Sequence, residues 1–300
     1  MVAVGLSGCG GSSGDAGDAT HRSGAPTVVV TTGILGDMVS EVVGDRAEVT
    51  VVLPAGVDPH DFEPSAKQVA ELGEASLVVA NGLGLEAGLA DALESVDAGG
   101  GKVLSLGEKL SPIPFAGDEA TPDPHFWMDP DRMASSARLV AQELASVTYI
   151  SEEELLGSAT AYAEKLALAD EEIQEALFSV PDGRRTLVTH HDSFGYFAER
   201  YGFTVLGTVV PGGSTQAEPS AGHLAELAAA VDSAGVPAIF SDASGSDELC
   251  VALAEEAGGD VEVVALYSES LGEPGSGADT YIGLITTNAH RIASALGGSG

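Results

Sequence analysis

Four side chains that could bind a metal ion follow segments with the composition of buried β-strands. In parallel α/β sheets, ligands bind beyond the carboxyl ends of the strands, so these side chains could meet at two neighbouring sheet edges. They are His60 after the strand expected at 48–53, His125 after 102–106, His191 after 186–190, and Asp279 in the glycine-rich loop beyond 261–266.

Three neutral imidazoles and one carboxylate make a plausible tetrahedral site for a borderline cation such as zinc. The spacing alone leaves other roles open, because a single histidine near a loop is often a capping or solvent-facing residue. Asp279 could also be the N-cap of the following helix. We expect the remaining histidines to be structural or on the surface; they are His21, His190, His223 and His290.

Short β-branched segments alternate with helical patterns in the first half of the chain, which favours a parallel sheet covered by helices. The expected strands are 27–32, 48–53, 76–80 and 102–106, and the expected helices are 34–43, 65–75, 85–96 and 131–147.

A longer helix is expected over 151–180. Ser151 is a favourable N-cap and Glu154 completes a capping box, while apolar residues recur every three or four positions from Leu155 to Leu177. At 1.5 Å per residue this helix would be ~45 Å long, longer than one small lobe. We therefore expect it to connect two lobes.

The alternation of strands and helices then resumes. The expected strands are 186–190, 204–209, 237–242 and 261–266, and the expected helices are 193–201, 221–233, 247–257 and 280–296. The predicted fold is α/β, with two lobes that each hold a four-stranded, mainly parallel sheet flanked by helices, joined by one long rigid helix. The predicted boundaries are 1–25 for a signal and tether segment, 26–148 for the first lobe, 149–182 for the linking helix and 183–300 for the second lobe.

The segment Leu6-Ser7-Gly8-Cys9 matches the small-residue box that precedes a lipid-modified cysteine in bacterial lipoproteins. Residues 10–25 are rich in Gly, Ser, Asp and Ala, which suits a flexible tether. Residues 1–5 are too short for an apolar signal region, as in a signal peptide cut short by the choice of start codon. We expect Cys9 to carry a lipid anchor that holds the protein outside the cytoplasm, at the cell surface or in the periplasm.

The composition excludes one class of function. Among 300 residues, 12 Lys and Arg stand against 46 Asp and Glu, a formal net charge of −34. Such a surface repels phosphate backbones, so we expect no nucleic-acid partner. No segment of 18 or more apolar residues occurs, so we expect no transmembrane helix.

Four sequence motifs resemble those of the zinc/manganese-binding lipoproteins, the solute-binding receptors of bacterial metal ABC importers. The similar segments occur in the same order and cover nearly the whole chain; they are 56–64 (GVDPHDFEP), 123–130 (DPHFWMDP), 191–198 (HDSFGYFA) with 201–203, and 268–272 (SESLG) with 278–282 (ADTYI).

This resemblance implies an extracytoplasmic receptor, a monomer, that binds one Zn²⁺ ion, or alternatively Mn²⁺, and delivers it to the transmembrane permease of an ABC importer. It assigns ligand roles to His60, His125, His191 and Asp279. Many zinc importers of this family carry a long histidine-rich loop before the second motif. Here the corresponding segment, residues 111–124, is short and contains no histidine. An adhesin of the same family is the alternative role.

Two enzyme classes are alternatives to a receptor. The segment Gly82-Leu83-Gly84-Leu85-Glu86-Ala87, with Glu108 about twenty residues later, fits the pattern of an NAD-binding turn. This makes an NAD-dependent oxidoreductase a second hypothesis, although a plain strand-to-helix turn fits as well. A zinc hydrolase is disfavoured, because no H-E-x-x-H motif occurs and four protein ligands leave no position for a catalytic water. We expect the protein not to be an enzyme.

Overall fold

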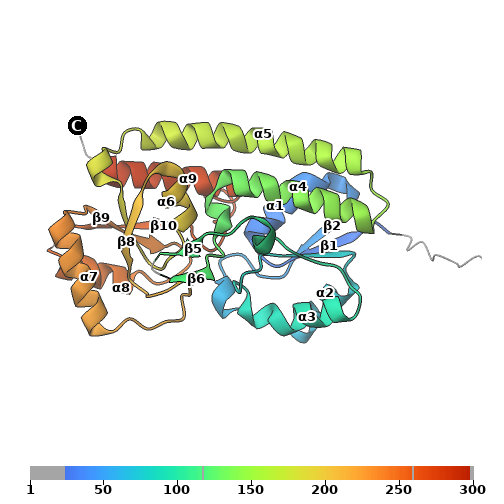
Figure 1. The fold of residues 1–300 in the computed structure, drawn as a ribbon, viewed down its shortest axis with the longest axis horizontal. Coiled ribbons are helices and arrows are strands. Elements are labelled where there is room, and N and C mark those ends of the chain that lie inside the picture. The colour runs from blue at the N-terminus through green and yellow to red at the C-terminus, as the bar shows by residue number, and fades with distance from the viewer. Residues whose placement is uncertain (1–23, 117, 259, 298–300) are drawn as a thin grey trace, which may run out of the picture.

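The computed structural model describes residues 24–116, 118–258 and 260–297. Two parallel four-stranded sheets lie at opposite ends of an elongated molecule (Figure 1). The strand orders are β2-β1-β3-β4 and β10-β9-β7-β8. The strands are β1 (Thr27–Val30), β2 (Glu48–Val51), β3 (Leu77–Ala80), β4 (Val103–Ser105), β7 (Thr186–Thr189), β8 (Thr204–Thr208), β9 (Ala238–Asp242) and β10 (Glu262–Leu266).

Helices cover both faces of the first sheet, and apolar side chains on both faces of its strands are therefore buried. Val28 and Val30 of β1 belong to the large core shared with α1, whereas Val29 belongs to a smaller core on the opposite face. The Thr32 hydroxyl accepts a hydrogen bond from the Leu35 amide and caps the first helix. The helices of this half are α1 (Gly33–Val43), α2 (Ala66–Glu74), α3 (Ala90–Ala98) and α4 (Pro130–Val147).

The second sheet has the same layered arrangement. One buried face packs in the large core and the other in a separate cluster that includes Val188, Ile239 and Cys250. Cys250 is a free, buried thiol in this cluster. The helices of this half are α6 (Gly195–Tyr201), α7 (Ala221–Ala234), α8 (Glu248–Glu256) and α9 (Tyr281–Gly297).

The predicted long connecting helix is confirmed as α5 (Glu152–Leu177), 26 residues long. The Ser151 hydroxyl caps it by accepting a hydrogen bond from the Glu154 amide. It runs along one side of the molecule past both sheets (Figure 1) and packs on α1, α4 and α9. Its buried stripe comprises Leu155, Ala159, Tyr162, Leu166, Ala169, Asp170, Ile173 and Leu177.

Two local features differ from the expectation. A two-stranded antiparallel hairpin, β5 (Pro114–Phe115) with β6 (Asp118–Pro122), was not predicted, because its short strands lack the run of apolar residues that marks a buried strand. The helix expected over 85–96 is a 3₁₀ turn, η3 (Ala87–Leu89), followed by α3. A Cβ at Gly88 would lie 2.2 Å from the Phe62 carbonyl oxygen, so another chain segment crosses closely here.

The segment Gly82–Ala87 forms a tight turn, in which Gly82, Leu83 and Gly84 all have positive φ. The Glu108 carboxylate accepts a hydrogen bond from the Leu83 amide at 3.0 Å, so it is used within this turn. The plain turn is therefore the interpretation that fits the structure. Within residues 24–297, apart from positions 117 and 259, no helix has the length and apolar character needed to cross a membrane.

Candidate metal centre

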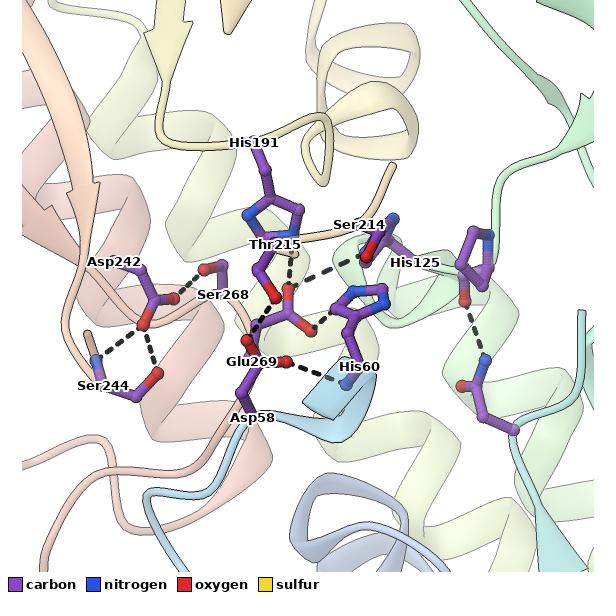
Figure 2. A network of polar contacts seen from close by, with 12 residues as sticks. Asp58, His60, His125, His191, Ser214, Thr215, Asp242, Ser244, Ser268 and Glu269 are labelled. Atoms are coloured by element: carbon purple, nitrogen blue, oxygen red, sulfur yellow. Dashed lines mark hydrogen bonds and ion pairs between the residues drawn. The ribbon is translucent and has the colours of Figure 1, made fainter. Parts of the chain in front are cut away.

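The three predicted histidines meet between the two sheets, and a glutamate joins them. His60 lies in the 3₁₀ turn η2 (Pro59–Asp61), His125 directly before η5 (Phe126–Met128), and His191 two residues after β7. Glu269 lies three residues after the end of β10. Figure 2 shows the Glu269 carboxylate between the rings of His60 and His191. The group therefore takes two residues from the carboxyl edge of each sheet, where α/β proteins bind ligands.

The distances fit a single small ion. One ligand atom from each of the four residues lies within 4.8 Å of the others. The Nε2 atoms of His60, His125 and His191 are 3.6, 3.7 and 2.9 Å from the nearest Glu269 oxygen. The His125, His191 and Glu269 side chains are at most 1% exposed and that of His60 is 5% exposed. We refer to these four residues as the His₃Glu cluster.

The polar atoms of the cluster are buried without hydrogen bonds. Nε2 of all three histidines and both carboxylate oxygens of Glu269 have no hydrogen-bond partner among the described residues. The Nε2 atom of His191 and the nearest Glu269 oxygen lie 2.9 Å apart as an ion pair, which requires that His191 is protonated. Because buried polar groups are nearly always paired, five convergent unsatisfied atoms indicate a site that could hold a cation.

Asp123 fixes the orientation of His125. Its Oδ1 atom accepts hydrogen bonds from the His125 amide at 2.9 Å and from the ring Nδ1 at 2.7 Å. When Asp123 is ionised, the ring proton lies on Nδ1 and the lone pair of Nε2 faces the cluster. Tyr196 supports this loop, since its hydroxyl donates to the Asp123 carbonyl oxygen at 2.8 Å.

A hydrogen-bonded support also holds the Glu269 loop. The Trp127 indole donates to the Ser268 carbonyl oxygen at 3.0 Å, and the Ser268 hydroxyl donates to the Asp242 carboxylate. The Ser244 amide and hydroxyl occupy the other oxygen of Asp242 (Figure 2). Glu269 is thus positioned by residues from both halves of the molecule.

The cluster shifts the pKa values of its members. Burial would lower the pKa of His191, but the Glu269 carboxylate outweighs it, so the pKa lies above the usual 6.5. Burial would raise the pKa of Glu269, but the charges of the histidines, His191 first, bring it below 4.5. Burial dominates at His60 and His125 and lowers both pKa values. Without metal, therefore, the proton of the cluster lies on His191, paired with ionised Glu269.

Burial also acts on the supporting carboxyl group. It raises the pKa of Asp123 to about 7, although the hydrogen bond from the His125 amide opposes this shift. The negative charge of Glu269 raises it further. A cation bound in the cluster would oppose both effects and favour the ionised form of Asp123.

The structure does not bring Asp279 to the His₃Glu cluster, so its role as the fourth ligand stays a prediction. Asp279 is exposed, and its carboxylate accepts a hydrogen bond from the Gly275 amide at 2.8 Å. The chain between Glu269 and Asp279 forms a glycine-rich loop, in which Gly275 and Gly277 have positive φ, and this loop separates the two carboxylates. Glu269 was missed although it lies closer to the end of β10, and that proximity was the available signal.

The other histidines lie outside the cluster. His190 is half-buried beside it, and the ring of His223 caps β8 through an Nε2 contact of 2.8 Å to the Thr208 carbonyl oxygen. His290 is exposed and contacts Glu172 at 3.0 Å. His21 and the proposed lipidation site Cys9 lie outside the described residues.

Comparison with known proteins identifies the family of this chain. Residues 28–295 match the family described as zinc-uptake complex component A, periplasmic. The chain belongs to this family. It is 34% identical over 279 residues to the zinc-binding protein TroA of Treponema pallidum, covering 91% of this chain and 89% of that protein.

A second relative is named for a different metal. The manganese-binding lipoprotein MntA of Halalkalibacterium halodurans is 26% identical over 299 residues, covering 99% of this chain and 96% of that protein. The solved structure of the periplasmic zinc-binding protein TroA of Treponema pallidum superposes with a TM-score of 0.84 at 32% identity, covering 91% of this chain and 99% of that one. The predicted α/β fold and family resemblance are confirmed.

Proposed function

We propose that this protein is the extracytoplasmic receptor of a metal ABC importer, binding one divalent transition-metal ion through His60, His125, His191 and Glu269. This proposal rests on one observation, the convergence of five buried polar atoms without hydrogen-bond partners within one small space. The metal is the cargo, and the role of the chain is to bind and deliver it, not to catalyse a reaction. Membership of the zinc-uptake component A family supports this role.

Zinc is the proposed cargo. Three imidazole nitrogens and one carboxylate oxygen suit a tetrahedral Zn²⁺ ion, whereas Mn²⁺ prefers a set richer in oxygen ligands. Manganese is the second candidate, since a relative is named as a manganese-binding lipoprotein. Zinc binds most such sites more tightly than manganese whatever the cell uses, so affinity alone does not decide the cargo.

The proposed partners are the metal ion and the transmembrane permease. We further propose that Cys9 carries a lipid anchor, that the protein acts as a monomer, and that residues 26–148 and 183–300 form two lobes linked by 149–182. A role in adhesion is the alternative within the same family. Deleting the gene and testing which metal restores growth in chelated medium examines transport and cargo together.

The test of the site is a direct binding measurement. Metal-free protein should take up one Zn²⁺ per chain in calorimetry or in competition with a chromophoric chelator. His60→Ala, His125→Ala and His191→Ala should each weaken binding strongly, while His223→Ala, on α7, should bind as the wild type does. Wild-type affinity in His125→Ala would contradict the proposed site.

A further inference from the structure

A loop of the second half holds the His60 segment by its backbone and by the residues on either side of it. The β8–α7 loop, residues 209–220, follows β8, and we call residues 55–62 the His60 loop. The Gln216 side-chain amide donates to the His60 carbonyl oxygen at 2.9 Å and to the Asp61 carboxylate at 2.7 Å. The Thr215 hydroxyl donates to the Asp58 carboxylate (Figure 2).

These contacts act on the position of the His60 ring. The Asp58 carboxylate also accepts a hydrogen bond from the His60 amide at 2.8 Å and so forms the cap of the turn that carries the ring. Thr215 and Gln216 therefore form hydrogen bonds with the turn on both sides of His60, at Asp58 and at Asp61. One further contact of the same kind joins the Gly56 amide to the Ser270 hydroxyl at 2.7 Å.

The β8–α7 loop is itself seated on the unpredicted hairpin. A Cβ at Gly213 would lie 1.9 Å from the ring of Phe115, so the ring packs directly against this glycine. The same ring lies 6.1 Å, centroid to centroid, from His125. Phe115 thus covers the His125 side of the cluster and supports the loop that bears Thr215 and Gln216.

An acid-lined cavity of about 650 Å³ lies outside this contact. Its lining includes Asp58 and Asp61 of the His60 loop, Gln216, and His190 next to His191, so it borders the His60 loop from outside the cluster. Glu218 and Glu248 add two further carboxylates, and neither lysine nor arginine is among its described lining residues. Such a cavity concentrates cations at its base.

The cluster is least buried on the His60 side, so this is the side on which a path to solvent opens most easily. His125 and His191 are fully buried, whereas the His60 side chain retains 5% exposure. The hydrogen bonds of Gln216 are exposed to water, which can replace them when they break. Opening at the other ligands would instead disturb the buried core around Trp127 and Phe194.

We propose that Thr215 and Gln216 are positioning residues that latch the His60 loop onto the cluster, and that metal enters and leaves through the acid-lined cavity when this latch opens. The inference rests on the proposed metal-binding function. It adds the residues that set the rate of exchange, none of which is a ligand.

Metal release tests the latch. Zinc-loaded wild type, Gln216→Ala, Thr215→Val and the double variant are mixed with excess chelator in a stopped-flow instrument. We expect the double variant to release zinc about tenfold faster or more, with a smaller change in equilibrium affinity because association also accelerates. Thr215→Ser retains the hydroxyl and should release at the wild-type rate. Gln142→Ala, an exposed glutamine of α4, is the matched control.

Amide hydrogen exchange of the metal-free protein provides a second, metal-independent measurement. Amides of the His60 loop should exchange faster in the double variant, while those of β1 and α5 should be unchanged. Wild-type release and exchange rates in the double variant would overturn the inference. A wild-type protein that binds no zinc would contradict the proposed function and the exchange route, whereas the exchange measurement still tests the latch itself.

Discussion

The Oδ1 atom of Asp123 lies 2.7 Å from Nδ1 of His125, while Nε2 of the same ring faces Glu269 at 3.7 Å. One carboxylate therefore sets the tautomer and the other belongs to the cluster. In metal sites such an outer carboxylate raises the basicity of the imidazole and holds its plane.

Asp123→Asn should weaken zinc binding by about 10–100-fold, the usual effect of losing such an outer partner. The asparagine keeps the size of the side chain but removes the charge that holds the proton on Nδ1. Chelator competition measures the loss, and Asp118→Asn, an exposed aspartate of β6, is the control. Equal affinities of the two variants would show that Asp123 does not act on the metal.

Glu269 and Asp279 offer a matched pair of carboxylates, one buried in the cluster and one exposed. Glu269→Gln should lower zinc affinity by at least about 100-fold, or about 2.7 kcal/mol, because the amide carries no charge and is a poor ligand. Asp279→Asn should stay close to wild type. The reverse result would favour Asp279 as the fourth ligand and contradict the proposed role of Glu269.

The sequence predicts the parts of this protein that depend on local pattern. β1 and β3 are short continuous runs of β-branched and aliphatic residues, which predict buried strands. α5 has a cap at Ser151 and a regular apolar stripe, which predict a helix. The hairpin of β5 and β6 has neither signal. Phe115 depends on Gly213, nearly a hundred residues away, for its place.

The candidate site shows the same division. The three histidines could be assigned because the motifs around them resemble those of a metal-binding family, and their places beyond strands agree with that assignment. The fourth position depends on the path of the loop 270–279, whose glycines at 275 and 277 adopt positive φ and separate Asp279 from the edge. No periodicity encodes that path, and the proximity of Glu269 to the end of β10 was the available signal that distinguished it from Asp279.

Zinc affinity should fall as the pH falls from about 8 to 6. The pKa of His191 lies above 6.5 in the metal-free protein, so this imidazole must lose a proton before it can coordinate. His60 and His125 have lowered pKa values and are already neutral. We expect proton release on zinc binding that grows as the pH falls through the pKa of His191, with a further contribution from Asp123, whose pKa is about 7 without metal. The release is measured in weakly buffered solution. His290→Ala should release the same number, and release of none would contradict the assignment.

The same pair makes a prediction for the metal-free fold. The raised pKa of His191 stabilises the fold below 6.5, and this contribution is lost as the pH rises through the folded-state pKa. The lowered pKa of Glu269 stabilises the fold above pH 4.5, and this contribution is lost as the pH falls through the folded-state pKa. The stability difference between wild type and Glu269→Gln should therefore be largest between about pH 4.5 and 6.5. Thermal unfolding of the metal-free proteins measures the difference, and a gap that widens above pH 8 would contradict it.

Arg200 of α6 joins three parts of the chain. Its guanidinium contacts Asp170 of α5 at 2.7 Å, and also Asp129 at 2.9 Å and Asp131 at 2.7 Å at the start of α4. The Tyr201 hydroxyl donates to the same Asp170 at 2.7 Å. Burial would raise the pKa of Asp170, but these partners hold it below its usual 3.8. The network thus fixes the linking helix against both halves.

Arg200→Met should lower the free energy of unfolding by about 1–3 kcal/mol. The side chain is only 19% exposed, so its loss leaves Asp170 partly buried without its cation and leaves Asp129 with Arg132 alone, at 3.4 Å, which costs more than losing a surface pair. Lys165→Met is the matched control, because the Lys165–Glu41 pair also joins α5 to α1 at 2.7 Å, but with side chains 55% and 40% exposed. That change should cost less than about 1 kcal/mol. Urea unfolding of both metal-free variants compares them, and equal losses would show that Arg200 is no more than a surface contact.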